Sequence, residues 1–244
     1  MKTVAIIQAR MGSTRLPGKV MMKIKGKTIL DHVITRVRQA KEIDDIVIAT
    51  TTSPNDEVIV RESQRLGVNC FRGAENDVLS RYYLAAKENQ ADVVVRITSD
   101  CPLIDPKVLD EVIRTYHFND YEIVTNAGNS SKNRTYPRGL DVEIFSIKAL
   151  ENANKKATKQ YQREHVTPYI YESSSRTYYY KNDENYSDYR WTLDTVEDLD
   201  LIRKVYNDLY EGNHDFYLEE IVDLIKRKPL LKRINAHVEQ KKLN

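Results

Sequence analysis

The chain has 244 residues, which is enough for one substantial domain with its own hydrophobic core. Its 38 basic and 36 acidic side chains leave a net charge of +2, so no strong overall field draws it to nucleic acid or to a membrane surface. The two cysteines, Cys70 and Cys101, indicate a reducing compartment without disulfides, and the lack of a signal peptide or a membrane-length apolar run predicts a cytoplasmic protein.

The first element is the apolar run at residues 4–7, which predicts a strand covered on both faces of a sheet. The basic segment that follows, residues 8–19, places Arg10, Arg15 and Lys19 on a loop rich in Gly, Ser and Thr. Open α/β sheets bind phosphates in the loop after the first parallel strand, so this segment predicts a phosphate site. A solvated basic loop is the alternative. The segment lacks both G-x-x-x-x-G-K-[ST] and G-x-G-x-x-G, which disfavours a P-loop NTPase and a Rossmann dehydrogenase.

Helix and strand patterns then alternate, which predicts a parallel sheet with helices on both faces. Residues 29–37 carry an apolar stripe with Arg36 on the opposite side, as in an amphipathic helix. Leu66 and Gly67 end a second helix, and Asn76 or Asp77 caps a third. The predicted strands are residues 45–50, 68–71 and 92–98, and the predicted helices begin at residues 29, 53 and 76–77.

The fourth strand ends in Asp100, followed by Pro102 and Pro106. A carboxylate at the end of a central parallel strand lies on the same sheet edge as the basic loop, and the prolines stiffen the chain that presents it. Capping of the next turn is the alternative role for Asp100. Asp105 is expected to cap the helix that begins at Pro106.

The second half of the chain is less regular. We expect one domain over residues 1–244, with 127–190 as an acceptor-binding or dimerisation subregion and 212–244 as a helical tail with a solvated, Lys-rich end. The polar segment 127–139 predicts a functional loop, and Tyr residues grouped at 169–189 suit a sugar site, a subunit interface or a Tyr-rich sheet face. Thr195 with Asp198 predicts a capping box, which leaves Asp194 free to point elsewhere. The further predicted strands are residues 121–126, 140–145, 178–180 and 190–193.

Residues 7–19 closely resemble the signature loop of the cytidylyltransferases that make CMP-sugars, in particular the spore coat polysaccharide (SpsF-type) branch beside the CMP-acylneuraminate and CMP-Kdo synthetases. The resemblance spans Val4 to about Leu209 and implies a three-layer α/β/α, Rossmann-like, GT-A-like nucleotidyltransferase fold with a mostly parallel sheet. It implies transfer of CMP from CTP to a sugar acid or related acceptor, with release of pyrophosphate, in bacterial surface or spore coat polysaccharide biosynthesis. Gln8 fits the SpsF-type pattern rather than the sialate and Kdo enzymes, so neither acid is assumed as the acceptor.

The resemblance also implies roles for particular residues. Asp100 and Asp194 match the family's metal-binding runs and are expected to bind Mg²⁺, which prefers carboxylates together with phosphate oxygens and water. Arg10, Arg15 and Lys19 are expected to hold the β- and γ-phosphates, where negative charge grows as the bond breaks. These five residues form the predicted catalytic group. The other predicted nucleotide-binding residues are Ala9, Met11, Gly12, Ser13, and, where the family reads the base, Arg72, Gly73, Asn76 and Arg81.

On the acceptor side, the run RGLD at residues 138–141 resembles the motif of the SpsF-type branch. It implies that Arg138 binds an anionic group and Asp141 a hydroxyl or amine; a surface ion pair between them is the alternative. The run QREHVTP at 162–168 also resembles that branch. It places His165 at the start of a helix, with a role in acceptor binding rather than as the base, or simply as a polar surface residue.

Two other functions fit parts of the sequence. A sugar-1-phosphate nucleotidylyltransferase would use UTP or GTP on the same architecture, but its loop usually has a G-x-G spacing that residues 8–13 lack. A non-catalytic nucleotide-binding protein could keep the cations without both Asp100 and Asp194, so their joint presence disfavours it. The expected partners are CTP, a small sugar-acid-like acceptor and a second copy of the chain, with no nucleic acid and no membrane.

Overall fold

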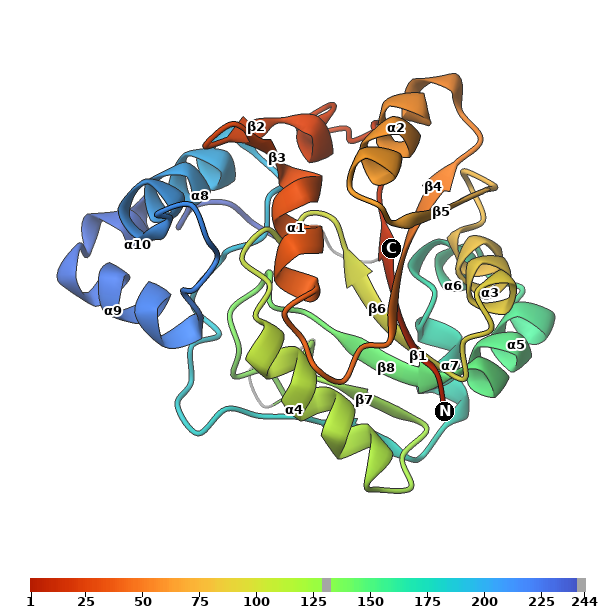
Figure 1. Cartoon of the computed structure of the whole chain (residues 1–244). Helices are drawn as coiled ribbons and strands as arrows, with labels where there is room; N and C mark the ends of the chain where they lie inside the picture. Colours follow the sequence, from red (N-terminus) through yellow and green to blue (C-terminus); the bar gives the residue numbers. More distant parts are fainter. Residues whose placement is uncertain (129–132, 241–244) are drawn as a thin grey trace.

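Strand β1 (Thr3–Gln8) lies inside a seven-stranded sheet with the order β5-β4-β1-β6-β8-β7-β9 (Figure 1). It pairs in parallel with β4 (Asp45–Thr51) and β6 (Val93–Thr98), and β5 (Asn69–Gly73) extends the sheet beyond β4. Strand β8 (Glu143–Ser146) runs antiparallel to both β6 and β7 (Ile123–Thr125), and β9 (Thr177–Tyr179) pairs in parallel with β7. The sheet is therefore mostly parallel, as predicted.

The computed structural model describes residues 1–128 and 133–240. The middle of the predicted loop at 127–139 and the predicted Lys-rich end at 241–244 lie partly or wholly outside these residues. No helix within the described part of the chain is both long and apolar enough to cross a lipid bilayer.

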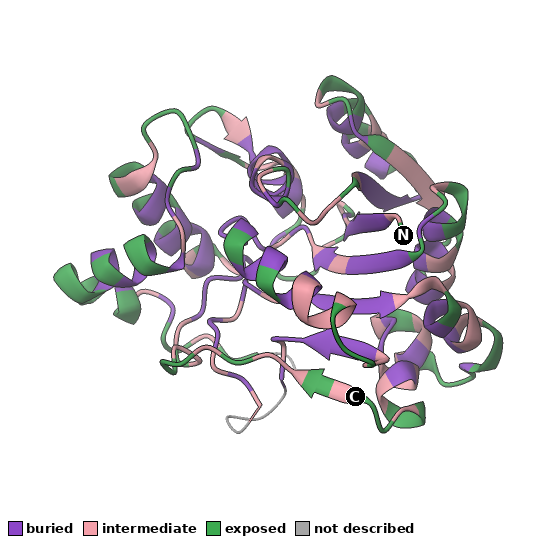
Figure 2. Ribbon diagram, turned by 60° about the horizontal axis from the view of Figure 1, so that its bottom comes forward, coloured by how far each residue is buried: buried purple, intermediate pink, exposed green. Residues whose placement is uncertain are grey.

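The central strands β1, β4 and β6 are buried on both faces because their successive side chains enter two different cores. Ala5 and Ile7 of β1 join one core, whereas Val4 and Ile6 of the same strand join the other. Helices cover both faces, so the central strands are buried, while the edge strands β5 and β9 and the outer helix surfaces are partly exposed (Figure 2). This confirms the predicted three-layer α/β/α fold.

The first core is covered by α1, α2, α4 and the C-terminal helices, and the second by α3, α5 and α7, with α6 beside α3 (Figure 1). The helices of the first layer are α1 (Ile29–Val37), α2 (Glu57–Arg65), α4 (Pro106–His117), α8 (Val196–Leu209), α9 (Leu218–Arg227) and α10 (Leu230–Arg233). Those of the second are α3 (Val78–Glu88), α5 (Ile147–Lys156), α6 (Gln160–His165) and α7 (Pro168–Ser173). The short elements are the 3₁₀ turns η1 (Lys19–Met21) and η2 (Pro54–Asp56), and the hairpin strands β2 (Lys23–Ile24) and β3 (Lys27–Thr28).

Several predicted caps are confirmed. Asp77 accepts a hydrogen bond from the Ser80 N–H at the start of α3, and Asp105 accepts from Lys107 and Val108 at the start of α4. Thr195 and Asp198 form the predicted capping box at the start of α8. Each cap satisfies backbone N–H groups that a helix start would otherwise leave without partners.

Three local predictions were wrong. Arg36 is fully buried rather than on the solvent side of α1, because the segment between α8 and α9 covers that side. Its Nε and Nη2 donate to the carbonyls of Ile104 and Phe216, each at 2.7 Å, and it stacks over the Phe216 ring. His165 ends α6 instead of beginning a helix. Residues 190–193 are extended but form only one bridge, from Arg190 to Arg138, rather than a strand.

A buried histidine pair fastens α1 to the chain before α9. His32 Nε2 donates to the Ile24 carbonyl at 2.9 Å, since a carbonyl can only accept, so its Nδ1 accepts from His214 Nε2 at 2.8 Å. Burial lowers the pKa of both rings and brings that of His214 to about 3, with the His32 and Arg36 charges acting in the same direction. Both histidines are therefore neutral in the folded protein at pH 7.

We expect the free energy of unfolding to fall as the pH is lowered from 7 to 5. The unfolded chain binds protons at these histidines near pH 6.5, whereas the buried pair does not, so low pH favours unfolding. For His214 alone the loss is about 2 kcal/mol by pH 5. Urea unfolding at several pH values measures the slope. His214→Gln, which keeps an N–H donor, should flatten it, and His237→Gln, which removes an exposed ring, should not; equal slopes in all three proteins would contradict the assignment.

Candidate functional site

The site lies where the carboxyl ends of β1 and β6 meet the extended segment 190–195. The Leu193 N–H donates to the Asp100 carbonyl at 2.8 Å, and the Trp191 N–H donates to the Arg138 carbonyl at 2.6 Å. These backbone hydrogen bonds hold three segments, distant in sequence, side by side at one edge of the sheet. They bring the residues after β6 and before α8 to the basic loop that follows β1.

Gly139 allows this close approach. Its φ is +103°, and a Cβ there would lie 2.5 Å from the Trp191 carbonyl carbon and the Thr192 nitrogen. Any other residue would therefore be strained and would push the segment 190–193 away from Arg138. In the sequence, Gly139 was only one residue of a motif. In the structure, it lets its own backbone lie against the backbone of Trp191 and Thr192.

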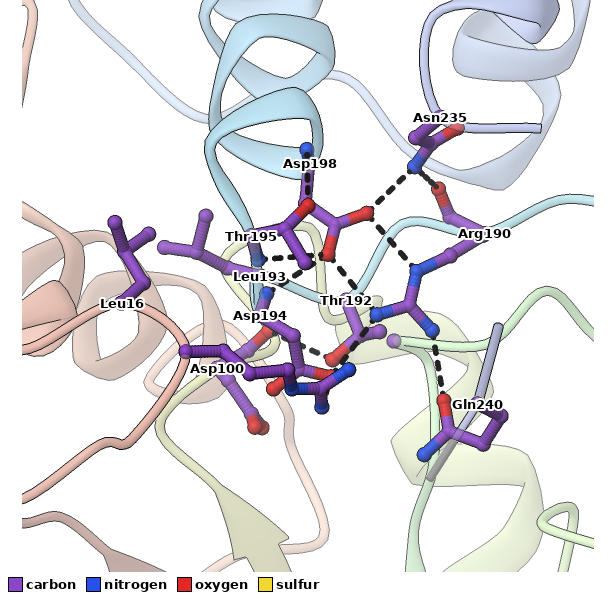
Figure 3. Close-up of polar contacts among 12 residues, drawn as sticks. Leu16, Asp100, Arg190, Thr192, Leu193, Asp194, Thr195, Asp198, Asn235 and Gln240 are labelled. Carbon is purple, nitrogen blue, oxygen red and sulfur yellow. Dashed lines mark hydrogen bonds and ion pairs between the residues drawn. The ribbon is translucent and has the colours of Figure 1, made fainter. Parts of the chain in front are cut away.

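Lys19 contacts both predicted metal ligands, Asp100 and Asp194, which are labelled in Figure 3. Its Nζ lies 2.9 Å from Asp100 Oδ2, 2.9 Å from Asp194 Oδ1 and 2.7 Å from the Leu193 carbonyl. Arg15 Nη2 reaches the other oxygen of Asp194 at 2.8 Å. The side chains of Lys19, Asp194 and Asp100 are 11%, 13% and 24% exposed, so this charge cluster is largely withdrawn from water. The structure thus brings together four of the five predicted catalytic residues.

The contacts within this cluster favour the charged forms of Lys19 and Asp100. Burial alone would lower the pKa of the Lys19 ammonium, but the charges and hydrogen bonds of Asp100 and Asp194 outweigh it and leave the pKa raised. Burial would likewise raise the pKa of Asp100, yet the Lys19 charge and the hydrogen bond from Thr98 leave it lowered. The raised pKa of Lys19 and the lowered pKa of Asp100 have the same meaning: the two groups form an ion pair that stays charged near neutral pH. The side-chain partners of Asp100 are Lys19, Thr98 and Cys101, so its contacts reach beyond the next turn, whose capping was its alternative role.

Asp194 is also fixed from its other side by Arg190. Arg190 Nη2 donates to Asp194 Oδ2 at 3.0 Å, while its Nε and Nη2 donate to the two oxygens of Asp198, each at 2.9 Å (Figure 3). Asp198 is fully buried and also accepts from Asn235 at 2.8 Å. Thr195 is occupied by helix capping, so the Asp194 side chain is left to face the basic loop.

A cleft of about 360 Å³ opens along this edge above the basic loop. It contains most of the residues predicted to bind the nucleotide: Ala9, Arg10, Ser13, Arg15, Lys19, Asn76, Arg81 and Asp100. Met11 and Gly12 lie in the same loop but do not line the cleft, and the Met11 N–H donates to Asp56 at 2.7 Å. His165 and Asp194, predicted for the acceptor and the metal, also line the cleft. The lining residues that sequence reasoning missed are Gln8, Thr14, Val20, Glu75, Val78, Thr98, Ser99, Gln160 and Glu164.

Arg72 does not reach the cleft, which corrects its predicted role in reading the base. Its guanidinium donates to the carbonyls of Thr51 and Ser53 at 3.0 and 2.9 Å and to the Glu57 carboxylate at 2.9 Å. These bonds turn the side chain toward the chain that enters α2. They use the guanidinium to hold β5 to the loop after β4, which is a structural role.

Arg81 is the basic residue that enters the cleft from α3. It is 2% exposed, and its Nη1 donates to the Ala74 carbonyl at 2.6 Å. Its Nε has no hydrogen-bond partner among the residues that the structure describes, and burial lowers the pKa of this guanidinium. A Cβ at Gly73 would lie 3.0 Å from Arg81 Cγ, so Gly73 makes room for this side chain. A buried cation with an unpaired donor favours a ligand that can accept a hydrogen bond.

Arg81→Met is expected to weaken CTP binding about 10- to 100-fold while leaving the melting temperature unchanged or higher, because it removes a buried charge along with a ligand contact. Titration calorimetry with CTP and Mg²⁺ measures the Kd. Arg72→Met is the matched comparison and should leave the Kd within about twofold. Equal Kd values for Arg81→Met and the wild type would remove Arg81 from the nucleotide site.

Two further cavities continue from the cleft, with volumes of about 580 and 670 Å³. Both are lined by Arg138, Asp141 and His165, the three predicted acceptor-binding residues. The smaller one shares Asp100, Asp194 and Arg15 with the nucleotide cleft. The two carboxylates therefore stand at the boundary between the cleft and the acceptor-side cavities.

The alternative considered for Arg138 and Asp141, a surface ion pair between them, is not formed. Asp141 instead accepts from Arg134 Nη1, and no carboxylate of the described residues lies within 4.0 Å of the Arg138 guanidinium. Arg138 is thus a cation at the cavity wall, with a pKa lowered by burial and by the neighbouring Arg134. Among the acceptor-side residues that the sequence did not identify are Arg134, Gln160, Tyr161, Glu164 and Gln240, whereas Tyr171 and Tyr179 belong to the tyrosine group that the sequence linked to a sugar site or an interface. Gln160 and Glu164 share a spacing of four on one helix, which is a further signal.

The donor set around Lys19 suits Mg²⁺. No group of three or more His, Cys, Asp or Glu among the described residues could hold a metal ion alone, and Mg²⁺ commonly takes one or two carboxylates with phosphate oxygens and water. One cation, the Lys19 ammonium, already contacts both Asp100 and Asp194. The cleft lining within the described residues holds four cations and four carboxylates, so a bound triphosphate needs further positive charge.

The parallel sheet, the basic loop after β1 and the paired carboxylates at its edge define a Rossmann-like nucleotidyltransferase. Residues 4–243 match the family model of the cytidylyltransferases. An uncharacterized protein of Methanocaldococcus jannaschii is 40% identical over 99% of this chain and 97% of its own, and the spore coat polysaccharide biosynthesis protein SpsF of Bacillus subtilis is 36% identical over 92% and 94%. A cytidylyltransferase structure from Leptospira borgpetersenii superposes with a TM-score of 0.89 at 34% identity over 99% of both chains.

The chain therefore belongs to the cytidylyltransferase family, as its N-terminal loop predicted. Members of that family transfer a cytidylyl group from CTP. The predicted enzyme class, a CTP-dependent nucleotidyltransferase, is therefore confirmed. The acceptor, the metal and the roles of single residues are proposals, which follow.

Proposed function

We propose that this enzyme transfers CMP from CTP to a sugar acid and releases pyrophosphate, with Asp100 and Asp194 holding Mg²⁺. The observation that supports this most is the contact of one ammonium, that of Lys19, with both carboxylates at the boundary between the nucleotide cleft and the acceptor cavities. A reaction that joins two substrates needs its charged centre at such a boundary.

Each part of the cleft then has a share in the reaction. Arg10, Arg15 and Lys19 bind the triphosphate, and their positive charge stabilises the pyrophosphate as it leaves. When bound, Mg²⁺ neutralises phosphate charge and polarises the α-phosphate. Arg81, which lines the cleft, offers positive charge to the nucleotide from the α3 side. The lowered pKa of Asp100 keeps its carboxylate charged and available as a ligand at neutral pH.

The acceptor-side cavities support an anionic, hydroxyl-rich acceptor. Arg138 provides a guanidinium that no described carboxylate neutralises within 4.0 Å, and a guanidinium binds a carboxylate through two parallel hydrogen bonds. The wall around it, with Asp141, Tyr161, Tyr171 and His165, presents the hydroxyl, carboxylate and ring groups that bind sugars. The kinship with the spore coat polysaccharide protein of Bacillus subtilis supports a product used for surface polysaccharides.

Pyrophosphate release tests the proposal. The enzyme is incubated with Mg²⁺, each of the four NTPs and a panel of acceptors that includes 3-deoxy-manno-octulosonate, N-acetylneuraminate and sugar 1-phosphates. We expect pyrophosphate only with CTP and a sugar acid, and none when EDTA removes the metal. Release from UTP or GTP with a sugar 1-phosphate would contradict the proposal and favour a sugar-1-phosphate nucleotidylyltransferase. No release from any pair would favour a nucleotide-binding protein without catalysis.

A homodimer and a cytoplasmic location belong to the same proposal. The dimer is what the family resemblance implies, and the location is the prediction from the two cysteines. Light scattering after size exclusion tests the first, and we expect twice the 28.4 kDa of one chain. A mass equal to one chain would contradict the dimer but would not contradict the proposed reaction.

A further inference from the structure

The C-terminal segment returns to the site after α10. Gln240, which follows α10 by seven residues, lines both acceptor-side cavities as well as a smaller cavity of about 200 Å³ beneath the segment. The sequence placed this residue in a helical tail outside the site. Its position instead makes the segment part of the wall against which an acceptor would lie.

Arg190 holds Gln240 there. Its Nη1 donates to Gln240 Oε1 at 2.7 Å, while the other nitrogens of the same guanidinium bind Asp194 and Asp198 (Figure 3). Because Arg190 can only donate, the amide oxygen of Gln240 faces it and the Gln240 NH₂ group faces away, free to donate. Asn235 ties the start of this segment down through bonds from its Nδ2 to the Arg190 carbonyl at 2.9 Å and to Asp198 at 2.8 Å.

We propose that Gln240 is an acceptor-binding residue and that Arg190 is the positioning residue that sets it in register with Asp194. One rigid guanidinium then fixes the distance between a metal-binding carboxylate on one side and an acceptor contact on the other. Gln240 donates from its amide to a hydroxyl or carboxylate of the sugar acid, beside Arg138 and Asp141. This inference rests on the proposed function, because it assigns the acceptor cavities to a sugar acid.

Steady-state kinetics with varied acceptor and varied CTP test the inference, using the acid from the pyrophosphate panel that the wild type turns over. Gln240→Ala is expected to raise the acceptor KM about tenfold, the value of one lost hydrogen bond, while the CTP KM and the melting temperature stay unchanged. Gln240→Glu keeps the bond to Arg190 but points a carboxylate at an acidic acceptor. Its acceptor KM should exceed that of the alanine variant by about threefold or more.

The relative acceptor KM values of Gln240→Ala and Gln240→Glu distinguish an acceptor-binding role of Gln240 from a packing role. If Gln240 only packed the segment in place, Gln240→Glu would be the milder change, because a carboxylate binds Arg190 at least as well as an amide does. Glu239→Gln is the matched control: it alters the charge of the exposed neighbour, which lines none of these cavities, and should leave both KM values unchanged. Arg190→Lys should raise the KM of both substrates, since it loosens Asp194 and Gln240 together.

The outcomes are distinct. A wild type that turns over an acid, with acceptor KM values in both Gln240 variants equal to its own, would overturn this inference alone. An acceptor KM raised in Gln240→Ala but restored in Gln240→Glu would also overturn it and leave Gln240 a packing residue. A wild type inactive with every acid would overturn the proposed function and this inference with it.

Discussion

Asp100→Asn and Asp194→Asn are each expected to lower turnover by at least about two decades, or roughly 2.7 kcal/mol of transition-state stabilisation. Asparagine keeps the shape of the side chain and removes the charge that binds Mg²⁺. Both carboxylates contact the same ammonium, so each supplies a comparable share of the negative charge at one point. Turnover is measured at saturating CTP and acceptor over a range of Mg²⁺ concentrations, and the half-maximal concentration should rise in both variants.

Asp105→Asn is the matched control. It lies five residues beyond Asp100 and caps α4 through hydrogen bonds from Lys107 and Val108, a role that asparagine also fills. Its turnover should equal that of the wild type. Turnover equal to the wild type in Asp100→Asn or Asp194→Asn would remove that carboxylate from the proposed metal site.

The two active-site variants should differ in stability. Asp194 binds Arg15, Lys19 and Arg190, whereas Asp100 binds Lys19 alone among the basic residues that the structure describes. Removing the Asp194 charge therefore takes an ion-pair contact from three cations instead of one and should lower the melting temperature further. Thermal unfolding without metal measures this difference.

The features that the sequence predicted depend on local pattern and on a general rule of sheet geometry. Apolar runs identified the buried strands, because both faces of β1, β4 and β6 enter a core. Since the ends of parallel strands share one edge, the sequence alone places the loop at 8–19 and Asp100 together. Asp194 was found differently, through the resemblance of its run, since helix capping alone explains the residues around it.

The features that it did not predict arise where distant segments cover one another. Arg36 looks solvent-facing within α1, and only the chain before α9, 180 residues later, buries it against Phe216. Arg72 and Arg81 are equally basic in sequence, but the carbonyls of Thr51 and Ser53 hold the first away from the cleft. Gln240 had no pattern at all, because its role depends on where Arg190 points. Such contacts are properties of tertiary packing, which periodicity does not record.

Lys19→Met is expected to lower turnover by about two decades and, unlike the aspartate variants, to make the stability of the protein depend on Mg²⁺. In the absence of metal the ammonium is the cation that contacts both Asp100 and Asp194. Without it two largely buried carboxylates face each other, which should lower the free energy of unfolding by about 2 kcal/mol at pH 7. Arg15 and Arg190 still bind Asp194, which limits the loss.

The pH dependence of this variant has a definite sign. In the wild type the pKa of Asp100 is lowered, so its contribution to stability is present above its unfolded pKa and is lost as the pH falls toward its folded value. In Lys19→Met burial is no longer opposed by the ammonium, and protonation of Asp100 relieves the repulsion. The difference in unfolding free energy between the two proteins should therefore shrink as the pH falls from 7 to 4.

Urea unfolding of both proteins, with and without Mg²⁺ and across that pH range, measures these effects. Added Mg²⁺ should raise the stability of Lys19→Met more than that of the wild type, because the ion replaces the missing cation between the carboxylates. Lys23→Met removes an exposed lysine four residues away and should behave as the wild type under every condition. If Lys19→Met were as stable as the wild type at pH 7 without metal, the ammonium would not be what holds Asp100 and Asp194 together, and the case for a single cation site between them would be lost.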